Sequence, residues 1–259
     1  MIKPVLHYFN LADEVVSFST TRHGGVSKGK LATLNINPHR GDEPSAVAEN
    51  LQAVAAEIGV QADKVIRLHQ IHETHCLTVT DAFFNLSVAE QYEMEEGKDA
   101  VVTDCRNVCI GVHTADCVPI LFYDPVHHAI GAAHAGWRGT VQRITQHTLR
   151  KMTELYGTDP KELKAVVGPC ISLKNFEVGQ EVYDAFSAAG FPMERIARMY
   201  EKWHIDLPLC NQLQLEELGV PAANILQSGI CTYDNASDFF SARILKEGFG
   251  TIYTGIALK

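Results

Sequence analysis

One stretch of the chain, Gly111 to Gly139, limits the possible folds more than any other, because it joins two β-forming runs to reactive side chains. The runs Val118–Tyr123 and Ala129–Ala135 are rich in apolar residues, which predicts two short strands. The turn residues Asp124 and Pro125 lie between them. We therefore expect a hairpin, or two strands in neighbouring positions of one sheet.

Two reactive side chains lie near the ends of these predicted strands. Cys117 precedes the first strand, and His134 is part of the second, within a run of glycine and alanine residues. Such small neighbours indicate close packing or space for a ligand. A thiol and an imidazole that meet at strand ends suit either a transition-metal site or a nucleophile with its base. Asp116 is either a proton carrier or a hydrogen-bonded carboxylate of the turn.

The composition excludes several classes of protein. The net charge of −9 argues against broad electrostatic binding to nucleic acid or to an anionic membrane. No apolar run approaches the ~20 residues of a membrane-spanning helix, and the N-terminal residues do not resemble a secretory signal. The 7 cysteines are an odd number without a CxxC pair, which indicates a reduced chain. We expect a cytoplasmic protein.

Periodicity predicts strands and helices along the whole length. Expected strands are Val15–Thr21, Val65–Leu68, Thr74–Thr80, Ala100–Thr103, Val108–Thr114, Ala165–Val167, Ile225–Cys231 and Thr251–Leu258. Expected helices are Pro44–Ile58, Thr140–Tyr156, Gly179–Ala189 and Leu207–Leu218, and Phe83–Gly97 is expected to form an acidic surface insertion or short helix. Without a linker or repeat, the pattern predicts one α/β domain over residues 1–259, with at least one large mixed sheet.

Arginines in or beside glycine-containing loops are candidates for binding an anion. Arg22 and Arg40 lie in such loops, and Arg138 lies where a predicted strand meets a predicted helix. A guanidinium group can hold an anion with two parallel hydrogen bonds. The alternatives are ordinary turn chemistry for the two loops and a structural salt bridge for Arg138.

Three histidines, His69, His72 and His75, follow a predicted strand. On a regular strand, residues three apart point to opposite faces, so their spacing does not place them together unless the chain bends. Taken alone, each is more typical of a surface or hydrogen-bonded residue than of a metal ligand.

Several motifs nevertheless resemble those of one known family. TADC-x-P (Thr114–Pro119) followed by HAGWRG (His134–Gly139) is similar to the YfiH-type laccase-domain family, also described as multicopper polyphenol oxidase-like. Weaker matching pieces occur in the family's order over nearly the full chain. They are STTR-x-GG-V-S from Ser19, LN at Leu34, GD at Gly41, QIH at Gln70, DA-x-VTD at Asp99, FEVG-x-EV at Phe176 and SG-x-CT at Ser228.

The resemblance implies a metal site formed by His72, Cys117 and His134. Cys117, Asp116 and His134 are the candidate catalytic residues. It also implies a fold with central mixed β-sheets packed together and flanked by helices. Candidates for contacting the substrate or phosphate are Arg22, Asn35, Arg40 and Arg138. The implied partners are a purine nucleoside and phosphate, and we expect a monomer or a small homo-oligomer.

The activities that the resemblance implies are phosphorolysis of adenosine, inosine and methylthioadenosine, together with adenosine deamination. Three protein ligands leave the fourth position of Zn²⁺ open, and zinc chemistry suits deamination. Copper is an alternative metal, and polyphenol oxidation of the laccase type an alternative activity. A third possibility is a hydrolase with Cys117 as nucleophile that edits peptidoglycan precursors. A fourth is a module that only binds metal or regulates a partner.

Overall fold

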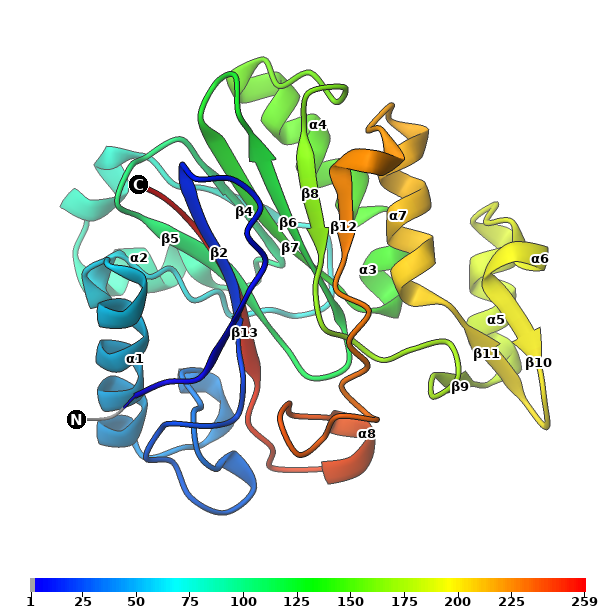
Figure 1. Ribbon diagram of the computed structural model, residues 1–259, viewed down its shortest axis with the longest axis horizontal. Coiled ribbons are helices and arrows are strands. Elements are labelled where there is room, and N and C mark those ends of the chain that lie inside the picture. The colour runs from blue at the N-terminus through cyan, green and yellow to red at the C-terminus, as the bar shows by residue number, and fades with distance from the viewer. Residues whose placement is uncertain (1–2) are drawn as a thin grey trace.

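The computed structural model describes residues 3–259, so the first two residues of the expected domain lie outside the described part. Two sheets form its centre (Figure 1). The four-stranded sheet is antiparallel, with the order β1 (Leu6–Tyr8), β2 (Val15–Thr20), β13 (Ile252–Leu258) and β5 (Cys109–Thr114). The six-stranded sheet has the order β12 (Ile225–Gln227), β8 (Lys164–Val167), β6 (Val118–Asp124), β7 (Ala129–Ala135), β4 (Ala100–Thr103) and β3 (Cys76–Thr78).

The six-stranded sheet is mixed, because its two edge strands are parallel to their neighbours and the inner pairs are antiparallel. At its centre β6 and β7 form the expected hairpin, with Val118 opposite Ala135 and Asp124 opposite Ala129. This register places the start of β6 next to the end of β7, at one end of the central strands. The candidate site lies at this end.

Alternation of side chains explains why the central strands are apolar throughout. Leu121 on β6 and Val101 on β4 pack between the two sheets, while Ile120 and Phe122 face the opposite side. That opposite side is covered by α4 (Ile144–Tyr156) and α7 (Leu207–Glu217). Both faces of the sheet are therefore buried, and burying each large apolar side chain contributes about 1.5–3 kcal/mol.

Helix α1 (Pro44–Ile58) covers the outer face of the four-stranded sheet, where Leu51 and Val54 pack against Phe18 and Tyr253. The domain thus has four layers, helix, sheet, sheet and helix, with α1 and α7 on opposite flanks (Figure 1). This arrangement confirms the predicted single α/β domain with mixed sheets flanked by helices.

Smaller elements complete the fold. The short helices are α2 (Val88–Glu95), α3 (Trp137–Val141), α5 (Gln180–Ala188), α6 (Met193–Ile196) and α8 (Ala242–Leu245). A three-stranded sheet of β10 (Ala197–Met199), β11 (Trp203–Ile205) and β9 (Glu177–Val178) projects beyond α7 (Figure 1). Short 3₁₀ helices are Gly29–Leu31, Pro38–Arg40, Ala62–Lys64, Asp81–Asn85 and Ala222–Asn224. No helix within residues 3–259 is long and apolar enough to cross a membrane.

Four predictions of secondary structure were wrong, one in the existence of a strand and three in the extent of an element. Residues 65–68 form no strand, because only Val65 makes an isolated bridge, to Cys109. The predicted helix 140–156 is two helices, broken at Arg143, whose φ of 64° is left-handed. The predicted strand 225–231 ends at Gln227, before the positive-φ residue Gly229. The strand predicted for residues 74–80 is limited to β3.

Candidate metal centre

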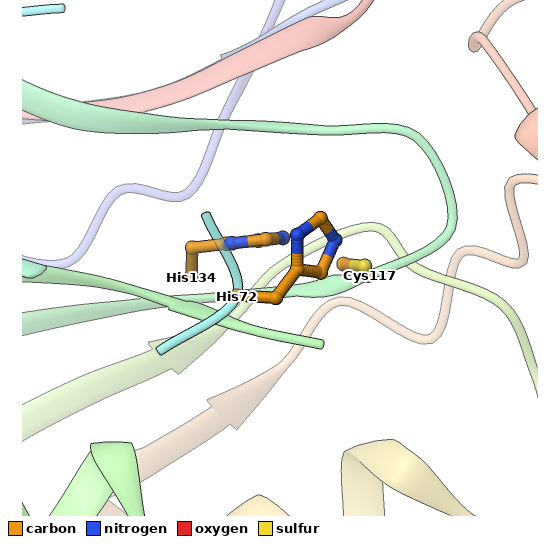
Figure 2. Close-up of side chains that lie close together, drawn as sticks. All are labelled: His72, Cys117 and His134. Carbon is orange, nitrogen blue, oxygen red and sulfur yellow. The ribbon is translucent and has the colours of Figure 1, made fainter. Parts of the chain in front are cut away.

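Three side chains from separate parts of the chain converge where β6 begins and β7 ends (Figure 2). His134 projects from β7, Cys117 immediately precedes β6, and His72 comes from the loop before β3. Their ligand atoms all lie within 4.8 Å of one another. The rings of His72 and His134 meet edge to face, with centroids 4.8 Å apart. The predicted trio is therefore brought together, and its geometry offers one candidate site for a metal ion.

The loop carrying His72 bends sharply, which is why strand periodicity could not place this residue. His72 has a φ of 68°, in the left-handed region that side chains other than glycine rarely adopt. The carboxylate of Asp99 accepts hydrogen bonds from three successive backbone N–H groups of this loop, those of Ile71 (3.1 Å), His72 (3.0 Å) and Glu73 (2.9 Å). The bend is held by these bonds.

Asp99 also holds the second histidine. Its Oδ1 lies 2.7 Å from Nδ1 of His134, and both side chains are buried. A carboxylate that accepts the Nδ1 hydrogen keeps the other ring nitrogen, Nε2, free to bind a metal. One carboxylate therefore orients two of the three candidate ligands. Asp99 belongs to the DA-x-VTD motif of the sequence, which did not predict this role.

The donor set and the packing fit a transition metal. Two imidazoles and a thiol are the ligands that zinc and copper prefer. Gly136 leaves the necessary room, because a Cβ atom there would lie 3.0 Å from Cδ2 of His72 and 3.1 Å from Sγ of Cys117. Together with the orientation by Asp99, these features make His72, Cys117 and His134 the residues that would hold the ion.

The electrostatics favour a thiolate at this position. Burial raises the pKa of the Cys117 thiol, but the positive charge of His134 and hydrogen bonds from both histidines outweigh it and lower the pKa. Burial lowers the pKa of His134, whereas the Cys117 thiolate and the bond to Asp99 raise it by more. The pair is therefore stabilised as thiolate and imidazolium when no metal is bound. A thiolate is the form that binds metal and the form that acts as a nucleophile.

Asp116 is buried and its carboxylate is fully engaged. It accepts hydrogen bonds from Thr232 Oγ1 (2.6 Å), Ser241 Oγ (3.0 Å) and the backbone N–H of Arg243 (2.8 Å). Its φ of 85° is unfavourable for a residue with a side chain, so these bonds hold a strained turn. Of the two interpretations of Asp116, this geometry supports the structural carboxylate over the proton carrier.

We therefore expect Asp116→Asn to reduce stability and leave metal binding in place. Three donors lose a charged acceptor, which predicts a loss of about 1–3 kcal/mol in the free energy of unfolding. Urea unfolding of the variant and the wild type measures this difference. A variant of unchanged stability that binds metal but has lost turnover would instead identify Asp116 as a proton carrier.

A cavity of about 250 Å³ opens above the trio. Besides His72, Cys117 and His134, its lining residues include Asn37, His39, Arg40, His69, Gln70, His113, Thr114, Phe249 and Thr251. His69 does not join the trio, because its ring stacks on His39 and its Nδ1 lies 2.6 Å from Glu96 Oε2. The cavity thus combines a candidate metal site with a wall of hydrogen-bonding side chains.

Of the predicted substrate-contacting residues, only Arg40 lines this cavity. The Arg22 side chain donates to the carbonyls of Ala32 and Ala236 instead. The Asn35 side chain is buried and bonds Asp42 and the 35–37 turn. Arg138 is exposed and lies over the ring of its neighbour Trp137. Arg22, Asn35 and Arg138 therefore have no direct place in the cavity wall.

The fold and the site define a single-domain α/β protein with a candidate His-Cys-His metal centre at the base of a cavity. The chain belongs to the family described as multi-copper polyphenol oxidoreductase laccase, which matches residues 16–259. This confirms the resemblance seen in the motifs.

Similar proteins of this family carry enzyme names. A purine nucleoside phosphorylase of Bacteroides thetaiotaomicron is 41% identical, covering 99% of this chain and 97% of that protein. An adenosine deaminase from an unknown prokaryotic organism is 36% identical, covering 98% of both chains. The crystal structure of the Bacillus licheniformis hypothetical protein YfiH superimposes with a TM-score of 0.91 at 30% identity, covering 99% of this chain and 97% of that one.

Proposed function

We propose that this protein is a zinc-dependent purine nucleoside phosphorylase that acts on adenosine, inosine and methylthioadenosine and also deaminates adenosine. The observation that carries the proposal is the cavity, in which the trio of metal-type ligands and the guanidinium of Arg40 line one space. Phosphorolysis needs an anion site next to a nucleoside site. The names of the two similar enzymes support the same assignment.

Arg40 is the residue we assign to phosphate. Its Nε donates to the carbonyl oxygen of Phe249 (3.1 Å), and its guanidinium lies over the Phe249 ring, 4.2 Å from the centroid. These contacts fix the plane of the group, while its two Nη atoms have no hydrogen-bond partner within residues 3–259. A fixed guanidinium with free Nη donors suits bidentate binding of a phosphate.

Phosphorolysis has two parts, attack by phosphate and departure of the purine. A phosphate oxygen forms a bond to C1′ of the ribose, the C1′–N9 bond breaks, and the purine leaves with the electron pair and takes up a proton. Arg40 would hold the phosphate beside the ribose, and His72, Cys117 and His134 would hold the metal. When bound, zinc supplies Lewis acidity and activates water at neutral pH, which suits replacement of the purine amino group in deamination.

The direct test is chromatography of adenosine incubated with zinc-loaded protein, with and without phosphate. Adenine that forms only with phosphate is the expected product, and inosine formed without phosphate would show deamination. If neither product exceeds a protein-free control, the nucleoside assignment is wrong. Precursor hydrolysis or metal binding without turnover would then be the next hypotheses.

The thiol-nucleophile hydrolase remains the second candidate, because the Cys117 thiolate is stabilised beside His134. Chelation separates the two mechanisms. Activity that requires zinc is lost with EDTA, whereas activity that depends on a cysteine nucleophile is retained. A laccase is less well supported. Within residues 3–259, the trio is the single group of three or more His, Cys, Asp or Glu side chains whose ligand atoms lie close enough together to hold one metal ion. Electron transfer through several coppers would need further ligand groups.

Replacing Arg40 tests the phosphate assignment. We expect Arg40→Met to raise the KM for phosphate by about tenfold to a hundredfold, because hydrogen bonds to charged groups contribute about 1.5–3 kcal/mol. Arg40→Lys keeps the charge without the two parallel donors and should fall between. The control is Arg138→Met, which replaces an exposed arginine outside the cavity and should leave the KM for phosphate unchanged. A rise in the nucleoside KM alone would place Arg40 against the nucleoside.

A further inference from the structure

Two buried polar atoms in the cavity wall lack a partner within the described chain. They are Nε2 of His113 and Oγ1 of Thr114, at the end of β5. Both residues line the cavity. Buried polar atoms in folded proteins are nearly always hydrogen-bonded, so orphaned atoms at a cavity indicate that its occupant supplies the partner.

The neighbours of His113 determine which ring nitrogen carries hydrogen. Nδ1 of His113 lies 3.2 Å from Oγ1 of Thr251, and Nδ2 of Asn37 donates to the same hydroxyl at 3.3 Å. The Asn37 amide orientation is set independently, because its Oδ1 accepts from the backbone N–H of His39 (2.9 Å). The Thr251 hydroxyl could accept from both neighbours, but within residues 3–259 its own hydrogen has no acceptor other than Nδ1 of His113, so we assign the hydroxyl as the donor to Nδ1.

Nδ1 of His113 is therefore an acceptor, and the hydrogen of the neutral ring lies on Nε2. Protonation of the ring would leave this Nε2 hydrogen in place. Burial lowers the pKa of His113 well below its usual value, and positive charges at Arg67, His39, Arg40 and His134 lower it further. At neutral pH the side chain is thus an uncharged donor fixed by the chain Asn37–Thr251–His113.

The surroundings indicate what this donor binds. Arg40, whose Nη donors are free, lines the same cavity as His113, and the charge of Arg67 also acts on the His113 ring. A donor in such an electropositive wall complements an anionic oxygen better than a neutral one.

We infer that His113 is a phosphate-binding residue, which donates its Nε2 hydrogen to a phosphate oxygen beside the Arg40 guanidinium. The inference rests on the proposed function in taking phosphate as the anion. Thr251 and Asn37 are then positioning residues, because they act on phosphate only by fixing the tautomer of His113.

Nitrogen-detected NMR of histidine-labelled zinc protein tests the inference without turnover. The expected spectrum shows hydrogen on Nε2 of His113, and inorganic phosphate should shift this resonance. Thr251→Ser, which keeps the hydroxyl, should preserve the tautomer, whereas Thr251→Val should release it. Hydrogen found on Nδ1 in the wild type, or no response to saturating phosphate, would overturn the inference.

Kinetics give a second, independent measurement. His113→Leu should raise the phosphate KM by about tenfold or more and leave the adenosine KM unchanged, since one hydrogen bond to a charged group is lost. His113→Gln retains an amide donor and should keep most of the affinity. A rise in the adenosine KM with the phosphate KM unchanged would contradict the assignment to phosphate.

The two levels of proposal can fail separately. If phosphate shifts His113 but no adenine forms from adenosine, phosphorolysis is wrong and the phosphate site stands. If phosphate-dependent adenine forms while phosphate does not shift the Nε2 resonance of His113, the reaction stands and this inference is wrong.

Discussion

Replacing Cys117 by alanine is expected to abolish turnover and to remove most of the bound zinc. Cys117 is the only thiol of the trio, and its loss leaves two imidazoles, of which that of His72 belongs to an exposed residue. Loss of a residue that merely orients a ligand already costs about 10–100-fold in metal affinity or activity, so losing a ligand should exceed that range. Zinc content after dialysis and adenine formation measure the two effects.

The matched control is Cys76→Ala, which removes a half-buried thiol from β3. It should retain zinc and activity, showing that removal of a thiol does not by itself impair the protein. Cys117→Ala that keeps its zinc but loses turnover would favour a thiol nucleophile over a metal ligand. Retention of both properties would contradict every role proposed for Cys117.

Replacing Asp99 by asparagine is expected to weaken zinc binding by about 10–100-fold. Asparagine has one acceptor oxygen in place of two, so it cannot serve both Nδ1 of His134 and the three N–H groups of the His72 loop. The ring of His134 and the bend at His72 lose their common support. Competition with a zinc-binding dye measures the affinity, and urea unfolding with and without zinc measures the stability.

Asp124 provides a close control for Asp99. It is also a buried carboxylate that accepts two backbone N–H bonds, from Val126 and His127, and pairs with the His127 ring at 2.9 Å. It lies at the opposite end of β6 from Cys117. Asp124→Asn should therefore lower stability without changing zinc affinity. Equal losses of zinc affinity in both variants would show that Asp99 acts only through general stability.

Burial and hydrogen bonding oppose each other in the titration of Asp99. Burial raises the pKa of its carboxyl, but bonds from His134, Glu73 and Ile71 together lower it below the ordinary value. A lowered pKa in the folded state means that the ionised carboxylate stabilises the fold above the unfolded-state pKa of about 3.9. That contribution is lost as the pH falls through the folded-state pKa. Asp99→Asn should not show this loss.

The central part of the fold could be predicted because its signals are local. The runs that form β6 and β7 are long and apolar, and Asp124 and Pro125 mark the turn between them. Helix α1 has a regular apolar stripe and ends at Gly59, which adopts the left-handed conformation expected there. By contrast, β1, β9, β10 and β11 have two or three residues each, too few to show any periodicity.

The sequence by itself determined the α/β class and the two central strands, whose ends carry Cys117 and His134, because hydrophobic periodicity acts over neighbouring residues. The structure decided that these strands form a hairpin. The motifs of the sequence, through a family resemblance, added His72. Only the tertiary structure decided that Asp99 orients both histidines, that Asp116 is committed to a turn and that Arg40 alone of the candidate arginines lines the cavity. These facts depend on hydrogen bonds between residues far apart in the chain, which leave no periodic trace in the sequence.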